Sequence, residues 1–336
     1  MEFILIIIGF ILLIKAADYF VDASTTIAKI FKVSEIVIGA TIVSIGTTLP
    51  ETMVSATSAF KGHGDIAYGN ALGSIICNTA LISALSLVFS PGKVESKTLK
   101  IPVIFFFLSF AMYAIFAFIF GGFSRVAGFI LFSIFILYVI AIIRNNKLKN
   151  SKQIEKIPEQ VEKNIDDVLE GRNVKDNKTN DIIKSIMTII ISAIVIAFAS
   201  NLLVDNGTAI ARKFHIPESV IGITMIALGT SLPELSTAIT SLVKGHSNLS
   251  IGNIIGANFF NVVVVSAIAA IVGPFKLPTS KMIGNVNASF IIDLPVASIV
   301  MVILCIPSIM NGRTKRWQGI LLLTIYALFL IYQFKS

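Results

Sequence analysis

Two glutamates occupy the same position of a six-residue motif that occurs twice in this chain. The sequence GTTLPE at residues 46–51 recurs as GTSLPE at residues 229–234, and both copies lie in long apolar stretches. A charged side chain at bilayer depth is costly and is normally retained for an ion or substrate path. Glu51 and Glu234 are therefore the first candidates for a functional site, and their matched positions predict that they share it.

The motif belongs to a longer internal duplication. Residues 20–78 align with residues 203–261 at a constant offset of 183 without a gap, and 25 of the 59 aligned positions are identical. Lys-Gly-His at 61–63 matches 244–246, and Gly-Asn at 69–70 matches 252–253. The two segments are therefore duplicated units, and one functional interpretation has to cover both.

The residues around Glu51 could supply oxygen ligands from one helix face. Thr47 lies one helical turn before Glu51, and Ser44 precedes Thr47 by three residues on the same stripe. Pro50 cannot donate a hydrogen bond to the carbonyl of Gly46 and crowds that turn. We therefore expect the carbonyls around residues 44–47 to be freed or tilted outward. The second copy repeats the arrangement with Ala227, Thr230, Ser231, Pro233 and Glu234.

A second polar row follows each motif. Ser74 and Asn78 are four residues apart and follow glycines that allow close helix approach, and the second copy has Ala257 and Asn261. Carboxylates, hydroxyls, amides and carbonyls without His or thiolate suit calcium or sodium rather than zinc, copper or iron. One calcium ion neutralises the two glutamates, whereas without calcium at least one should hold a proton or a monovalent ion. This chemistry predicts alternate occupation of one site, which is the basis of ion exchange.

The composition predicts the elements that must position these residues. The chain is 55% hydrophobic and 14% charged, and its mean hydropathy is +0.87, so we expect an all-α polytopic membrane protein. Windows of about 20 residues predict ten transmembrane helices. These are residues 3–26, 35–59, 66–90, 100–121, 124–143, 184–211, 217–243, 250–273, 286–309 and 317–334.

Five spans per half place the second repeat upside down relative to the first, so we predict two inverted five-helix repeats. The halves are residues 1–144 and 183–336, and a charged linker, residues 145–182, joins them. Of the basic residues, 19 fall on the linker side and 7 on the other, so both termini are expected outside and the linker in the cytoplasm. The first span could also be read as a signal peptide, but no basic segment precedes it and its counterpart lies mid-chain.

The doubled G-T-[TS]-L-P-E motif, followed by G-N-x-x-G-[SA]-x-x-x-N, resembles the α-repeats of the sodium/calcium exchanger family, in the cation/calcium antiporter superfamily. The short linker and compact helices resemble a prokaryotic-type member of that family. The resemblance implies a calcium site formed by Glu51, Glu234 and the carbonyls of Thr47 and Thr230. It also implies sodium sites that draw on Ser44, Thr48, Ser74, Ala227 and Ser231. Asn78 and Asn261 are both amides, which resembles the potassium-independent branch.

The chain departs from the family pattern at Ala257, where Ser74 has a hydroxyl in the first copy, and this loss bears on sodium binding. The function expected is calcium/sodium antiport by alternating access, with calcium, sodium and the lipid bilayer as partners. A proton-coupled calcium exchanger is the nearest alternative, and a cation channel or a membrane sensor with a structural cation are the others. No catalytic, cofactor or nucleic-acid motif is present, so we expect neither an enzyme nor a resident cofactor.

Overall fold

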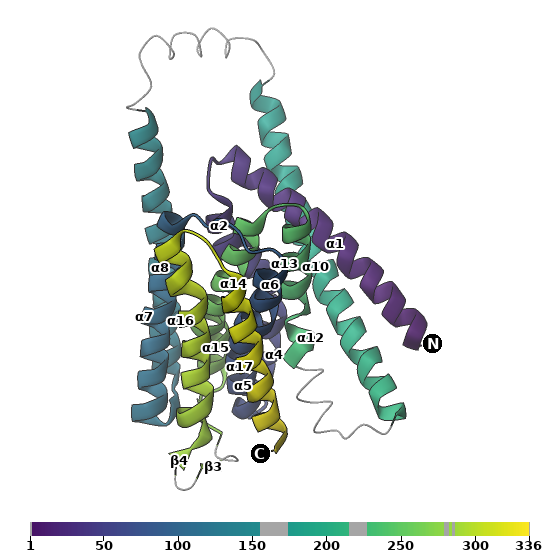
Figure 1. The fold of residues 1–336 in the computed structure, drawn as a ribbon, viewed down its shortest axis with the longest axis vertical. Coiled ribbons are helices and arrows are strands. Elements are labelled where there is room, and N and C mark those ends of the chain that lie inside the picture. The colour runs from purple at the N-terminus through teal and green to yellow at the C-terminus, as the bar shows by residue number, and fades with distance from the viewer. Residues whose placement is uncertain (1, 155–173, 215–226, 279–281, 284–285, 336) are drawn as a thin grey trace.

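The computed structural model describes residues 2–154, 174–214, 227–278, 282–283 and 286–335, and these are mostly helical (Figure 1). The elements of the first half, with η for π-helical segments, are α1 (Glu2–Ile30), α2 (Glu35–Ile38), η1 (Gly39–Val43), α3 (Ser44–Thr47), α4 (Leu49–Phe60), α5 (Gly64–Cys77), η2 (Asn78–Ser83), α6 (Ala84–Phe89), α7 (Ser96–Phe120), β1 (Gly122–Phe123) and α8 (Arg125–Ile154). Those of the second half are α10 (Val174–Lys213), α12 (Ala227–Thr230), α13 (Leu232–Val243), α14 (Ser247–Phe260), η4 (Asn261–Val265), α15 (Ser266–Val272), β2 (Phe275–Lys276), β3 (Met282–Ile283), β4 (Val286–Asn287), η5 (Ser289–Asp293), α16 (Leu294–Asn311) and α17 (Arg316–Lys335).

Seven helices of the described residues are long and apolar enough to cross a membrane. An eighth span results if the pair Glu35–Thr47 and Leu49–Phe60, bent by 46°, counts as one. The chain is thus a multi-pass helical membrane protein. The predicted span 317–334 corresponds to α17. The predicted span 217–243 begins outside the described residues, and part of the predicted linker also lies outside them. The number ten therefore stays a prediction.

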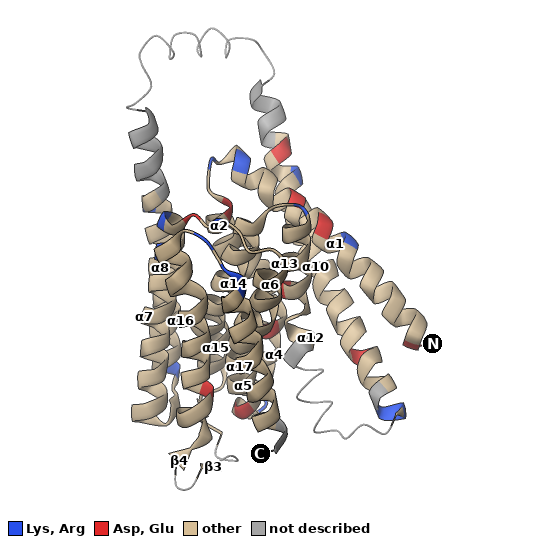
Figure 2. Ribbon diagram, in the orientation of Figure 1, with Lys and Arg blue, Asp and Glu red and all other residues tan. Residues whose placement is uncertain are grey.

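The molecule has two distinct ends (Figure 1). At one end, α8 and α10 lead into the central linker, and the loops 31–34, 90–95, 244–246 and 312–315 lie there; we call this end the linker face. The start of α1 and the end of α17 lie toward the opposite end, the terminal face, together with the loops 61–63 and 121–124, residues 273–278 and the strands β3 and β4. Figure 2 shows that charged residues gather mostly at the two ends. An apolar middle between charged ends is the arrangement expected of membrane-spanning helices.

The most buried spans are those that carry the second polar row of each repeat. In an 18-residue apolar window of each span, 72% of the residues of Gly64–Phe89 and 83% of those of Ser247–Val272 are buried, against 28–39% in the other five. The spans made by α1, α7, α8, α10 and α16 therefore surround a centre built from α5, η2 and α6 and from α14, η4 and α15. This arrangement puts the duplicated segments in the middle of the protein.

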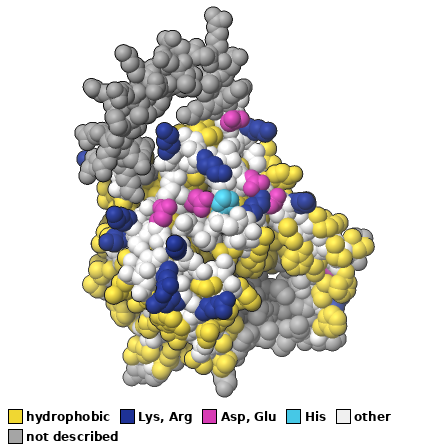
Figure 3. Space-filling model, turned by 45° about the horizontal axis from the view of Figure 1, so that its top comes forward, with side chains coloured by type: hydrophobic (Ala, Val, Ile, Leu, Met, Phe, Trp, Pro, Cys, Tyr) yellow, Lys and Arg dark blue, Asp and Glu magenta, His cyan; other side chains and the backbone are white. Residues whose placement is uncertain are grey.

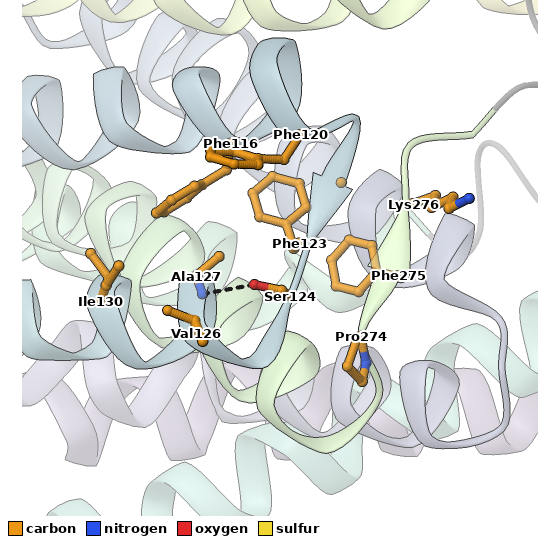
Figure 4. Close-up of a pocket in the computed structure, with 11 residues that line it drawn as sticks. Phe116, Phe120, Phe123, Ser124, Val126, Ala127, Ile130, Pro274, Phe275 and Lys276 are labelled. Atoms are coloured by element: carbon orange, nitrogen blue, oxygen red, sulfur yellow. Dashed lines mark hydrogen bonds between the residues drawn. The ribbon is translucent and has the colours of Figure 1, made fainter.

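Short backbone contacts join the two halves at both ends. At the terminal face, β1 pairs antiparallel with β2, and the rings of Phe123 and Phe275 are 5.2 Å apart. An apolar groove of about 570 Å³ lies beside this pairing and is lined by phenylalanines of α7 and by α8 (Figure 4). At the linker face, the backbones of Lys93 and Arg313 pair in an isolated antiparallel β-bridge. None of the groove residues is a predicted site residue.

Glycines of α14 set how closely the second repeat approaches the first. A Cβ on Gly256 would meet the Ser44 hydroxyl and would lie 2.5 Å from the Cα of Ala40. A Cβ on Gly252 would meet the backbone carbonyl of Ile36. Small residues at this spacing allow two backbones in a membrane to touch. The contact places Ser44, and the motif that follows it, against α14.

We predict that Gly256→Ala destabilises the protein by about 1–3 kcal/mol, because the added methyl group overpacks against backbone that cannot move aside. The measurement is thermal unfolding of the purified protein in detergent. Ser133→Ala, at an exposed position of α8, is the control and is expected to unfold like the wild type. Equal stability of Gly256→Ala and the control would contradict the close approach of α14 to η1.

Candidate cation-binding site

The first copy of the motif forms a broken helix. α3 ends at Thr47, Thr48 leaves the helical region with φ −86° and ψ 5°, and α4 begins at Leu49 with Pro50 in its first turn. The 46° bend of the span lies at this break, where the proline predicted an interruption. Glu51 is in the first turn of α4 and is fully buried. Its carboxylate is therefore at a helix N-terminus, which favours negative charge.

The second copy has the same local geometry. Ser231 has φ −90° and ψ 4° between α12 and α13, and Pro233 and Glu234 stand in the first turn of α13. Glu234 is also fully buried. The duplicated sequence thus folds twice into the same device, a broken helix with a buried carboxylate directly after the break.

The two carboxylates lie next to each other at the centre of the protein. Neither Glu51 nor Glu234 has a hydrogen-bond partner for its carboxylate oxygens among the described residues. The polar side-chain atoms of four other predicted site residues are likewise buried and unpartnered within the described part of the chain: Ser74, Asn78, Ser231 and Asn261. Buried polar groups are nearly always satisfied. These six side chains, predicted from the two motifs and the polar rows that follow them, are therefore candidate ligands for an ion.

The hydroxyls of two further predicted site residues, Ser44 and Thr48, form hydrogen bonds with backbone carbonyls. The Ser44 hydroxyl lies within hydrogen-bond distance of two carbonyl oxygens, those of Gly39 at 2.6 Å and Asn253 at 3.0 Å, and can donate its one proton to either. The Thr48 hydroxyl donates to the carbonyl of Ser44 at 2.7 Å. Their oxygens keep lone pairs for a cation, because a donating hydroxyl still accepts. Of Ala227, the structure describes the backbone in α12 but not the side-chain surroundings.

Two amides that the sequence analysis did not assign to the site connect the two repeats. The Thr230 hydroxyl donates to the Asn70 side-chain oxygen at 3.2 Å. The Thr47 hydroxyl donates to the Asn253 side-chain oxygen at 3.3 Å. Each asparagine thus accepts from the threonine of the other repeat, beside the glutamate. The signal that could have found them is the matched Gly-Asn pair in the duplication.

The side-chain nitrogen of each asparagine donates to a hydroxyl, but the two hydroxyls lie at positions that do not align in the duplication. The Asn70 side-chain nitrogen donates to the Ser55 hydroxyl at 2.9 Å and to the Glu51 carbonyl at 3.1 Å. The Asn253 side-chain nitrogen donates to the Thr237 hydroxyl at 3.0 Å. Thr237 aligns with Val54, one residue before Ser55. The two repeats therefore support the same amide from neighbouring positions of the helix.

Together, the fold and the site define a multi-pass membrane protein with a carboxylate pair buried among oxygen donors at its centre. The chain belongs to the sodium/calcium exchanger protein family, whose sequence model matches residues 1–144 and 184–335. This confirms the resemblance in the motifs.

The relatives and solved structures that the chain resembles cover nearly all of it. An uncharacterized membrane protein of Methanocaldococcus jannaschii is 32% identical over 95% of this chain and 94% of its own length. The sodium/calcium exchanger MaX1 of Methanosarcina acetivorans is 29% identical over 99% and 98%. A solved structure of the sodium-calcium exchanger NCX_Mj, soaked with Na⁺ and Ca²⁺, has a TM-score of 0.78 and 28% identity over 98% of this chain and 97% of that one.

We predict that Ser55→Ala weakens calcium binding by about fivefold, because Asn70 loses an acceptor and a hydrogen bond contributes about 1 kcal/mol. Adding Val54→Thr should restore the affinity, since it puts a hydroxyl where the second repeat has Thr237. The measurement is the calcium concentration that half-saturates uptake into proteoliposomes. If Val54→Thr did not restore calcium affinity to Ser55→Ala, the hydrogen bond from Asn70 to a hydroxyl of α4 would not support calcium binding.

Proposed function

We propose that this chain is a secondary active antiporter that exchanges calcium for sodium across the membrane by alternating access, with both ions using one site between the repeats. The observation that carries this proposal is that Glu51, Glu234 and four other predicted site residues have buried polar side chains without a hydrogen-bond partner among the described residues. Family membership and the relative MaX1, named a sodium/calcium exchanger, support the same ion pair.

The mechanism follows from the charge of the site. Glu51 and Glu234 together carry two negative charges when ionised, and one calcium ion neutralises them. Sodium ions neutralise the same carboxylates when calcium leaves. A site with uncompensated charge is costly to carry through the low-dielectric interior, so only the loaded forms reorient. Calcium and sodium therefore move in opposite directions, and the sodium gradient supplies the energy.

The ligands divide between the two ions. The carboxylates of Glu51 and Glu234 and the backbone carbonyls of Thr47 and Thr230 hold calcium, because calcium takes six to eight oxygen ligands. After calcium has left, sodium ions bind to the carboxylates and to the flanking positions Ser44, Thr48, Ser74, Ala227 and Ser231. Asn78 and Asn261 complete the centre with amide oxygens. With only two acids in the site, potassium is not co-transported.

The topology of the proposal is ten membrane spans in two inverted repeats. Residues 1–144 and 183–336 form the two halves, and residues 145–182 link them. The loops 61–63 and 244–246 are duplicates of one another and lie at opposite ends of the bundle, which supports the inversion (Figure 1). Because the basic residues gather on the linker face, that face is cytoplasmic and both termini are outside the cell membrane.

A proton-coupled calcium exchanger is the alternative that one observation favours. Ala257 is fully buried at the position matching Ser74, so the second copy lacks one hydroxyl that could hold sodium. In that alternative, protons replace sodium on the carboxylates.

We predict that calcium-45 uptake into proteoliposomes requires internal sodium and is lost, by more than about a hundredfold, in Glu51→Gln and in Glu234→Gln. Either change removes a charge that calcium needs for neutralisation. Liposomes loaded with potassium, or with an acidic interior, provide the comparison.

Asp65→Asn removes an exposed carboxylate of the same chain and is expected to leave uptake unchanged. Uptake driven equally well by an acidic interior would establish the proton-coupled alternative. Uptake that is indifferent to the internal ion would contradict exchange altogether and indicate a channel.

We predict that Ala257→Ser lowers the internal sodium concentration required for half-maximal calcium uptake about threefold to tenfold, because it restores a hydroxyl ligand to the second copy. The measurement is the sodium dependence of uptake at fixed calcium, with Ala257→Cys as the size control, because a thiol is a poor ligand for a hard cation such as sodium. An unchanged sodium dependence would remove position 257 from the sodium site.

A further inference from the structure

A lysine at the linker face ties the second repeat to the first helix. Lys244 follows α13, and its Nζ is 2.6 Å from a carboxylate oxygen of Asp18 and 2.6 Å from one of Asp22. It also donates to the backbone carbonyl of Asp18 at 3.2 Å. Asp18 and Asp22 are one turn apart on α1, so one lysine satisfies a pair of carboxylates on one helix face. Burial lowers the pKa of Lys244, but its hydrogen bonds to Asp18 and Asp22 and their charges outweigh this effect and raise it.

The contact lies in a wider polar cluster on the linker face. His246 Nδ1 is 2.7 Å from a carboxylate oxygen of Glu35, which begins α2. Figure 3 looks onto this end of the molecule and shows acidic and basic side chains gathered around a histidine. Below the cluster, α1 packs along α13. The end of α13 is therefore held both to α1 and, through the following loop, to α2.

The residues at the terminal face that match Lys244, Asp22 and Asp18 do not form such an ion pair among the described residues. By the offset of 183, Lys61 matches Lys244, Asp205 matches Asp22, and Asn201 matches Asp18. Lys61 and Asp205 are both exposed, and no ion pair joins them in the described part of the chain. The counterpart of Asp18 is an amide, so the terminal-face set has one carboxylate where the linker-face set has two.

Helix packing has the same asymmetry. α1 and α10 pack side by side along their length and form a pair at one flank of the molecule (Figure 1). α1 packs extensively on α13, whereas its counterpart α10 has no packing of that extent on α4 among the described residues. A structure whose inverted repeats differ in this way is in one of two states, and the other state exchanges the roles of the repeats.

We propose that Lys244 with Asp18 and Asp22 is an ion-pair latch that holds α1 against α13 and keeps the linker face closed. In the opposite state this latch opens, and Lys61 binds Asp205 at the terminal face. The extra carboxylate on α1 biases the equilibrium toward the state described here. The proposal rests on alternating access in the proposed function but not on which residues bind calcium or sodium.

The size of the effect follows from exposure. The side chains of Asp18 and Asp22 are 46% and 59% exposed, and that of Lys244 is 24% exposed. Partly exposed pairs of this kind change an equilibrium by about twofold to fivefold each. That is enough to move a two-state population measurably when the states are close in free energy.

The test measures both faces at once by electron spin resonance distances in proteoliposomes at fixed sodium. One labelled pair is Thr26→Cys with Val243→Cys, which reports the α1–α13 separation at the linker face. The matched pair is Phe60→Cys with Ala209→Cys, at the duplicated positions of the terminal face. The native Cys77 and Cys305 are buried. The variants are Lys244→Gln, the double change Asp18→Asn with Asp22→Asn, and Asn201→Asp, with Lys61→Gln as the matched control.

We expect Lys244→Gln to raise the population of the long linker-face distance and of the short terminal-face distance about threefold to tenfold. The double aspartate change and Asn201→Asp should shift both distances in the same direction, and Lys61→Gln in the opposite one. Unchanged distances in Lys244→Gln and in the double variant would overturn the latch. Lengthening at the linker face with no change at the terminal face would also overturn it, since that result is local fraying. These distances do not depend on calcium transport, so loss of exchange in other assays leaves the result interpretable.

Discussion

Two carboxylates side by side in a low-dielectric interior are the constraint on which the rest of this structure depends. Burying one charge is costly, and burying two of the same sign adds their repulsion. The N-terminal turns of α4 and α13 offset part of this cost, because each glutamate stands where the helix dipole favours an anion. The carboxylate oxygens of Glu51 and Glu234 have no hydrogen-bond partner among the described residues, so a cation or a proton has to offset the rest of the cost. In the proposed function, a bound cation supplies this compensation.

The surrounding elements hold these two groups in register. Breaks at Thr48 and Ser231 begin the helices that carry the glutamates, and the glycines of α14 bring the second repeat against η1. Asn70 and Asn253 then cross between the repeats, so each repeat helps to orient the other's threonine. Because both copies have a helix break followed by a buried glutamate, the candidate site is assembled from two halves that are alike in chemistry, and in the proposed topology these halves are inverted. Such a pair can face either side of a membrane with little change in its own geometry.

The duplication predicted the candidate site in two parts. The helix breaks and the buried glutamates follow from the local spacing around Pro50 and Pro233, whereas Ser74, Asn78 and Asn261 come from the second polar row of each repeat. Family membership confirms the sodium/calcium exchanger resemblance, whereas the individual ligand assignments and the number of spans stay predictions. The sequence analysis did not assign Asn70 and Asn253 to the site, because the threonines that bond to them are 160 and 206 residues away in the sequence. The ion pairs of Lys244 could not be predicted from the sequence for a different reason. A duplicated sequence contains two possible latches, and only the folded state determines which of them is closed.

Equilibrium calcium binding to the purified protein, measured with increasing sodium, tests most directly whether the two glutamates form one shared site. The account predicts one calcium ion per chain, displaced competitively by sodium, with the same single ion lost in Glu51→Gln and in Glu234→Gln. Two calcium ions per chain, each lost with one glutamate alone, would contradict it. Calcium binding that sodium does not displace would contradict it as well, because the carboxylates would then not be common to both ions.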